Sequence, residues 1–69
     1  MNVYTLGDGT DIVGIYSTES DALTAAHRYI AERMCHNCRI AERLLDSDRF
    51  FGSTVLWYED CGKLVRYVD

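Results

Sequence analysis

The feature that most constrains this fold is a pair of hairpin patterns, one near each end of the chain. Residues 3–6 and 12–16 are β-prone and are separated by a turn with two glycines, which supply the positive φ that tight turns need. Residues 54–58 and 63–68 are also β-prone and are separated by residues 59–62. Both patterns predict β-hairpins.

The stretch between the hairpins has helical periodicity. Ser17 or Thr18 can cap a helix, and Glu19 and Asp21 suit the positive end of its dipole. Apolar residues at helical spacing follow: Leu23, Ala26, Ile30, Met34, Ala41, Leu44 and Leu45. The opposite face is polar: Glu32, Arg33, Arg39, Glu42 and Arg43. The pattern predicts an amphipathic helical region.

The length of this region predicts an interruption. One helix over residues 18–45 would be about 42 Å long, whereas a six-residue strand spans about 20 Å. We therefore expect a break or bend near residues 35–38, whose side chains are mediocre helix formers. The alternative is an unbroken helix whose overhang packs on a second subunit.

These elements predict one α+β domain covering residues 1–69, in the order β-β-α-(α)-β-β. A four-stranded antiparallel sheet with helices on one face would bury the apolar residues. Apolar residues are 48% and charged residues 26% of the chain, as in ordinary globular domains. A membrane span and a signal peptide are not expected, and three cysteines favour a reducing cytoplasm.

The net charge is −4, and it is unevenly distributed along the chain, because residues 1–27 contain no Lys or Arg. The sequence shows no basic stripe with interleaved aromatics, which argues against direct nucleic-acid binding. Negative patches favour a basic protein partner instead. The expected contact residues are the acids of the turns and helix start, with one strand tyrosine: Asp8, Asp11, Glu19, Asp21, Glu59, Asp60 and Tyr58.

Strand aromatics are a second feature of the expected surface. Trp57 and Tyr58 are neighbours, so their side chains point to opposite faces of a sheet. At least one large aromatic should therefore lie on the face without helices or at an edge of the sheet. Such a residue is either an ordinary half-exposed strand tyrosine or an anchor for a partner.

The cysteines raise the possibility of a metal site. Cys35 and Cys38 form a Cys-x-x-Cys pair, and His36, Cys61 and His27 are further potential zinc ligands. A second paired motif is missing, and the alternative is that Cys38 is a small buried apolar residue. We predict no cofactor and keep zinc through Cys35, Cys38, Cys61 and His36 as the alternative.

Catalysis is not expected. Ser17 and Ser20 lie in the helix-capping segment, and the sequence contains no nucleophile elbow or phosphate-binding loop. A thioredoxin-like reaction needs its first cysteine at a helix N-terminus, whereas Cys35 follows a helical stretch. A chain of 69 residues also has little room for a dry pocket.

The first 30 residues resemble small phage and prophage proteins. The resemblance lies in residues 3–6, a Gly/Asp turn, the run Gly14-Ile15-Tyr16-Ser17 and an alanine-rich helix. Size, acidity and the missing catalytic motif also resemble anti-CRISPR proteins, which inhibit host defence by binding surveillance-complex subunits. No family site residue is carried over.

The resemblance implies an inhibitor in the cytoplasm of an infected bacterial host. It would bind a basic surface of a nucleic-acid-handling complex, such as a CRISPR effector subunit, and one form would imitate DNA phosphates. The alternatives are a zinc-stabilised module and a homodimeric adaptor.

Overall fold

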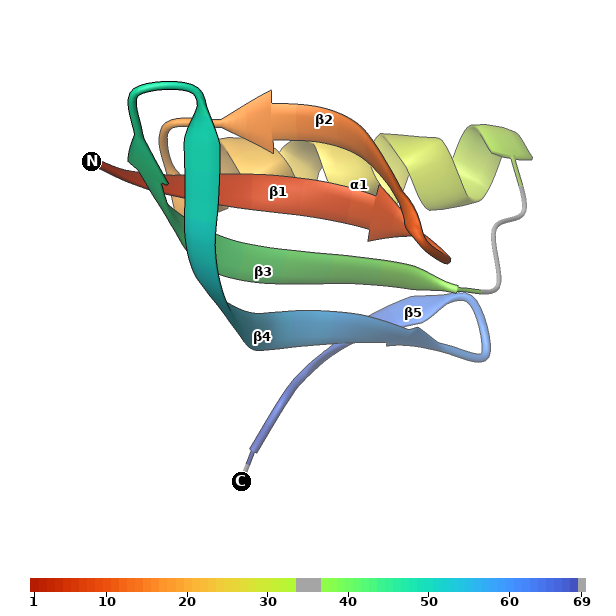
Figure 1. The fold of residues 1–69 in the computed structure, drawn as a ribbon. Coiled ribbons are helices and arrows are strands. Elements are labelled where there is room, and N and C mark those ends of the chain that lie inside the picture. Colours follow the sequence, from red (N-terminus) through yellow and green to blue (C-terminus); the bar gives the residue numbers. More distant parts are fainter. Residues whose placement is uncertain (34–36, 69) are drawn as a thin grey trace.

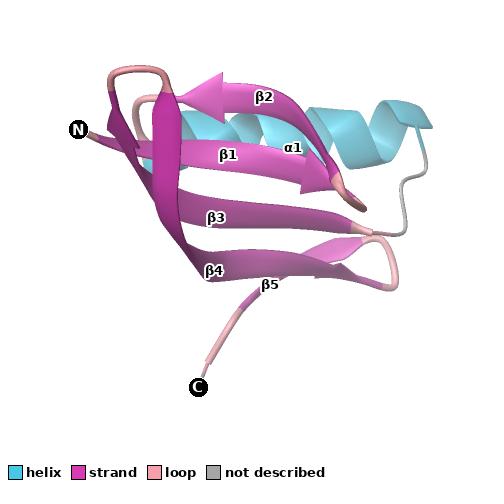
Figure 2. Cartoon of the chain, viewed as in Figure 1, coloured by secondary structure: helices cyan, strands magenta, loops and turns pink. Residues whose placement is uncertain are grey.

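The computed structural model describes residues 1–33 and 37–68 (Figure 1). Its elements are β1 (Asn2–Asp8), β2 (Asp11–Tyr16), α1 (Glu19–Arg33), β3 (Cys38–Asp46), β4 (Arg49–Asp60) and β5 (Lys63–Arg66). The strands form one antiparallel sheet in the order β2-β1-β3-β4-β5, and α1 lies along one of its faces (Figure 2). The expected α+β class is confirmed, but the sheet has five strands where the sequence predicted four.

Both predicted hairpins are present, and the additional strand is β3. β1 pairs with β2, and β4 pairs with β5. β3 lies between these two hairpins and pairs with β1 on one side and β4 on the other. The hairpin formed by β3 and β4 was not predicted.

The expectation of a second helical stretch over residues 39–45 is wrong, since these residues belong to β3. A central strand has both rows of backbone groups paired, and this tertiary pairing outweighs a helical preference. α1 ends at Arg33, and its 15 residues extend about 22 Å, close to the length of the strands. The alternative prediction, an unbroken helix over residues 18–45 whose overhang packs on a second subunit, is therefore also wrong. The predicted break falls largely on residues 34–36, outside the described part of the chain.

The helix start follows the sequence prediction. The Asp21 backbone N–H donates to Thr18 Oγ1 at 3.1 Å, so Thr18 is the N-cap. Further along, Ala22 and Ala26 are fully buried and Ile30 is nearly so. The small alanines let α1 approach the sheet closely.

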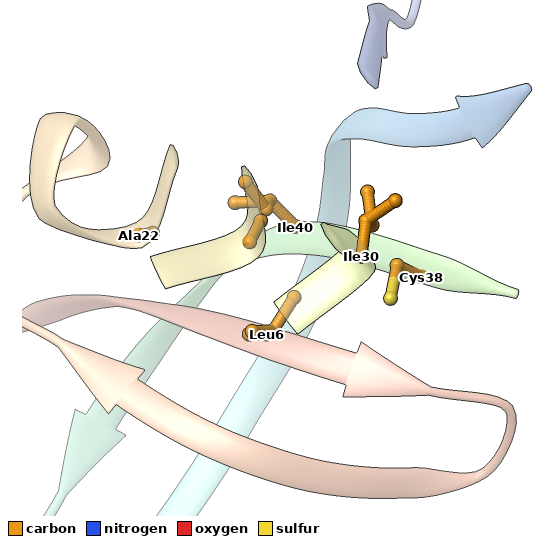
Figure 3. Packing of buried hydrophobic residues seen from close by; sticks show 6 residues of the cluster. Leu6, Ala22, Ile30, Cys38 and Ile40 are labelled. Carbon is orange, nitrogen blue, oxygen red and sulfur yellow. The ribbon is translucent and has the colours of Figure 1, made fainter. Parts of the chain in front are cut away.

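The core lies between α1 and the sheet (Figure 3). Leu6, Cys38 and Ile40 point from β1 and β3 toward the buried alanines of α1 and toward Ile30. Trp57 packs at the margin of this cluster, and it is the cross-strand neighbour of Ile40. We call this side of the sheet the helix face and the opposite side the helix-free face.

The helix-free face is partly closed by the bend of β4. Two register shifts interrupt the pairing of this strand with β3, and Gly52 has a φ of 69°. In Figure 1 the first part of β4 turns steeply away from the direction of its second part. Thr5 is only 2% exposed although α1 covers the other face. The sheet therefore curls, and its helix-free face is concave.

Within the described residues, no helix is long and apolar enough to cross a membrane.

Candidate functional site

Two of the predicted partner-binding acids are used inside the molecule. Asp8 is half-buried, and its carboxylate accepts a 2.8 Å hydrogen bond from the hydroxyl of Tyr29, which joins the end of β1 to α1. Glu19 Oε2 accepts from Trp57 Nε1 at 2.6 Å and from Arg66 at 3.3 Å. These contacts tie the start of α1 to β4 and β5, so both carboxylates have structural tasks.

Glu59 and Asp60 belong to the tight turn between β4 and β5. Cys61 and Gly62 both have positive φ, as the central residues of a two-residue hairpin turn do. Glu59 Oε2 accepts a 2.7 Å hydrogen bond from the Gly62 backbone N–H. The Asp60 carboxylate, first as hydrogen-bond acceptor and then as a charge, raises the pKa of the Cys61 thiol.

Asp11 and Asp21 are exposed, and their carboxylates make no hydrogen bond or ion pair with the described residues. They lie at opposite ends of the sheet. β1 and β4 run in the same direction, so the β1–β2 turn beside Asp11 and the β4–β5 turn lie at the same end of the sheet (Figure 1). Asp21 lies with Glu19 at the other end. The predicted acidic set is therefore divided between two ends of the molecule.

Tyr58 lies on the helix-free face, as the alternation with Trp57 predicted. It is half-buried and is the cross-strand neighbour of Arg39. Its ring packs edge-to-face on Tyr67, with ring centroids 6.2 Å apart.

The cysteines do not form a metal site in the described part of the chain. Cys38 is 1% exposed and packs in the core, whereas Cys61 is exposed in the β4–β5 turn. His27 is exposed on α1. Cys35 and His36 lie outside the described residues, and the described residues hold no group of three or more potential ligands. The position of Cys38 agrees with its alternative interpretation as a small core residue.

Two adjoining hollows lie on the concave helix-free face. A broad groove of about 830 Å³ has Tyr58 and Tyr67 among its lining residues. A smaller pocket of about 110 Å³ adjoins it, and Arg39, Ser53 and Val55 line both. We call the two together the trough. Its smaller part joins residues of β1 and β4, which are not neighbours in the sheet, because of the bend in β4.

Two arginines line the smaller pocket, and neither pairs with a carboxylate in the described part of the chain. Arg39 is exposed and makes no hydrogen bond or ion pair with the described residues. Arg43 is half-buried. Its Nε–H donates to Thr5 Oγ1 at 3.1 Å, and its guanidinium carbon lies 5.9 Å from the centre of the Phe50 ring. The ion pair found among the described residues joins Arg66 and Glu19 and involves neither of these two arginines.

Sequence reasoning missed this arginine pair because it placed residues 39–45 on a helix. The signal that could have found it is the alternation in β3. Cys38 and Ile40 face the core, whereas Arg39, Ala41 and Arg43 face the trough.

Comparisons of the chain with protein-family models, with curated proteins and with solved structures found no significant match. Function is therefore inferred from the charge and geometry of its own residues.

Proposed function

We propose that this chain is a small acidic binding protein of the phage inhibitor type and that it performs no catalysis. It occupies a basic surface of a bacterial nucleic-acid-handling complex, such as a CRISPR effector subunit, and so blocks that complex. The supporting observation is the unneutralised charge. The net charge is −4, and among the described residues Glu19 is the carboxylate that shares an ion pair, so the negative charge of the others is not neutralised by a described base. The electrostatic field of a negatively charged protein speeds its association with a basic surface.

The contact residues proposed for this function are Asp11 and Asp60. Both are exposed, and their turns lie at the same end of the sheet. Asp8, Glu19 and Glu59 are poorer choices, because each accepts a hydrogen bond that holds the fold together.

The titratable groups offer support for a non-catalytic role. The pKa of Tyr4 is raised, first by burial and then by the nearby Glu42 carboxylate, which accepts its hydroxyl hydrogen bond at 3.4 Å. The pKa of Cys61 is raised by Asp60. Both shifts keep the side chain protonated near neutral pH, whereas a nucleophilic thiol needs a lowered pKa.

The test measures whether the chain prevents purified CRISPR effector complexes from binding labelled target DNA. We expect inhibition that weakens with added salt. The double variant Asp11→Asn/Asp60→Asn should raise the half-inhibitory concentration by about tenfold or more, since charges at an interface act on association. The control Asp46→Asn/Asp48→Asn removes the same charge at the opposite end of the sheet and should inhibit like the unaltered chain.

If the unaltered chain leaves DNA binding by the whole panel of effector complexes unchanged, the inhibitor proposal is wrong for that class. If both double variants inhibit equally well, the two acids are not the contact.

The second candidate function is that of a homodimeric adaptor, and the exposed edge of β2 favours it. β2 is an outer strand, and its exposed apolar residues are Ile12, Val13 and Ile15. It contains no Lys, Arg or Pro, the residues that protect strand edges. The opposite edge, β5, is four residues long and carries Lys63 and Arg66.

Sedimentation equilibrium tests the homodimer. We expect a concentration-dependent dimer that Ile15→Lys abolishes, because a charge on the edge opposes strand pairing. Leu44→Lys is the matched control, since Leu44 is 45% exposed and Ile15 is 52% exposed, and Leu44 lies on the central strand β3. A monomer at millimolar concentration excludes this candidate.

A further inference from the structure

Arg43 is half-buried, and its guanidinium has no counter-ion among the described residues. Arginine is almost never fully buried without a paired anion, and even partial removal of its charge from water costs free energy. The described residues provide Arg43 with one hydrogen-bond acceptor, the neutral hydroxyl of Thr5, and with the face of the Phe50 ring. A neutral hydroxyl does not balance the charge. An anion that enters the pocket would therefore meet a positive charge that no described carboxylate neutralises.

The same contacts hold Arg43 in place. Thr5 is almost completely buried, and its hydroxyl is also within 3.4 Å of the Ala41 carbonyl oxygen, to which it donates. The hydroxyl is therefore fixed, and it engages only the Nε–H of the arginine. The Nη–H donors have no acceptor among the described residues. These donors give arginine its two-pronged fit to carboxylate and phosphate groups.

We propose that the smaller pocket of the trough is a binding site for an oxyanion, a carboxylate or a phosphate group, held by Arg43 and Arg39. The two arginines lie on the same face of β3, with Cα atoms about 13 Å apart at the usual strand rise. Their long side chains can therefore approach one anion from two sides. Thr10 and Ser53 add hydroxyl groups to the lining.

The volume of the pocket limits the size of the ligand group. Its volume of about 110 Å³ gives room for a small group and a few water molecules. A carboxylate or phosphate group fits this space, whereas a whole nucleotide does not. The rest of a larger ligand would extend into the adjoining groove, toward Tyr58 and Tyr67.

Asp11 opposes the ligand and makes the site sensitive to one substitution. Asp11 also lines the pocket, and its carboxylate forms no ion pair with either arginine. A negative charge at this position repels an oxyanion. Asp11→Asn should therefore tighten oxyanion binding, although it should weaken inhibition of a basic partner. The opposite signs separate this site from the proposed function.

The experiment follows the Arg43 Nε–H resonance of the ¹⁵N-labelled chain by NMR. Inorganic phosphate and sodium acetate are added in separate titrations at constant ionic strength. We expect a saturable shift of Arg43 Nε–H with at least one of them. The Nε–H of Arg49, which is exposed near the β3–β4 turn, should stay unmoved.

Three variants complete the test. Arg39→Gln alters an exposed side chain, so the fold should persist, and it should weaken binding several-fold as followed at Arg43 Nε–H. Arg43→Gln should abolish the binding seen in backbone amide shifts of β3. Arg49→Gln should bind like the unaltered chain.

The response to the two anions identifies the anionic group of the ligand. Saturation by phosphate alone assigns a phosphorylated ligand, saturation by acetate alone assigns a carboxylate ligand, and saturation by both supports the shared chemistry. The proposal is overturned if neither anion saturates, or if Arg39→Gln and Arg43→Gln bind as tightly as Arg49→Gln.

Discussion

The indole Nε1 of Trp57 donates a 2.6 Å hydrogen bond to the carboxylate of Glu19. Trp57 lies in β4 and Glu19 is the first residue of α1, so the bond joins the helix to a strand 38 positions later. The guanidinium of Arg66 lies over the indole ring and bonds the same carboxylate. This three-residue contact fixes the start of α1 over the C-terminal hairpin.

Glu19→Ala should lower the free energy of unfolding by about 2 kcal/mol, since hydrogen bonds to charged groups contribute about 1.5–3 kcal/mol. Urea unfolding followed by Trp57 fluorescence measures the change. Asp48→Asn is the control and should change stability by less than about 0.5 kcal/mol, because Asp48 is exposed in the β3–β4 turn. If Glu19→Ala leaves the free energy of unfolding unchanged, the Trp57 contact adds no stability.

Ala26→Leu should destabilise the protein by about 2 kcal/mol, because adding carbon atoms to a packed core forces neighbours apart. Ala26 has no exposed surface and contacts the cluster that contains Leu6 and Ile40. The thermal midpoint measures the loss. Ala31→Leu serves as the control, since Ala31 is exposed on the same helix. Equal midpoints for the two variants would contradict the close helix–sheet packing.

Gly14→Ala should disturb Tyr16, because a Cβ atom at position 14 would lie 2.8 Å from the tyrosine ring. The ring covers the glycine within the same strand. In the double variant Gly14→Ala/Tyr16→Ala the steric conflict is absent, so the two losses of stability should not add. Urea unfolding of the two single variants and the double variant gives the coupling. Strict additivity would show that the ring moves away without cost.

Asp60→Asn should speed the alkylation of Cys61 at pH 8. The Asp60 carboxylate raises the thiol pKa, so its removal increases the thiolate fraction. Mass spectrometry of the peptide that contains Cys61 gives the rate of iodoacetamide modification. Asp48→Asn is the control at the opposite end of the sheet. An unchanged rate would show that Asp60 does not control the thiol.

The same shift gives a direction for the pH dependence of stability. A thiol whose pKa is raised on folding contributes stability that is complete below its ordinary pKa near 9. That contribution is lost as the pH rises through the raised pKa. Tyr4 acts in the same direction from its ordinary value near 10. Stability should therefore fall in the alkaline range, and Cys61→Ser should reduce the fall.

Local features of the fold were predictable from sequence because neighbouring residues decide them. The glycine-containing turns predicted both terminal hairpins, and the residues around Thr18 predicted the helix start. The alternation at Trp57 and Tyr58 placed one aromatic on each face of the sheet.

Only the tertiary structure decided the state of residues 38–46 and the surface that they form. Their side chains suit either a helix or a strand, and pairing with both β1 and β4 selected the strand. That choice moved Arg39 and Arg43 from a supposed helix surface into the trough. It also set which acids have internal partners, because Glu19 meets Trp57 only when the sheet brings positions 38 residues apart together. Sequence periodicity carries no information about contacts over such separations.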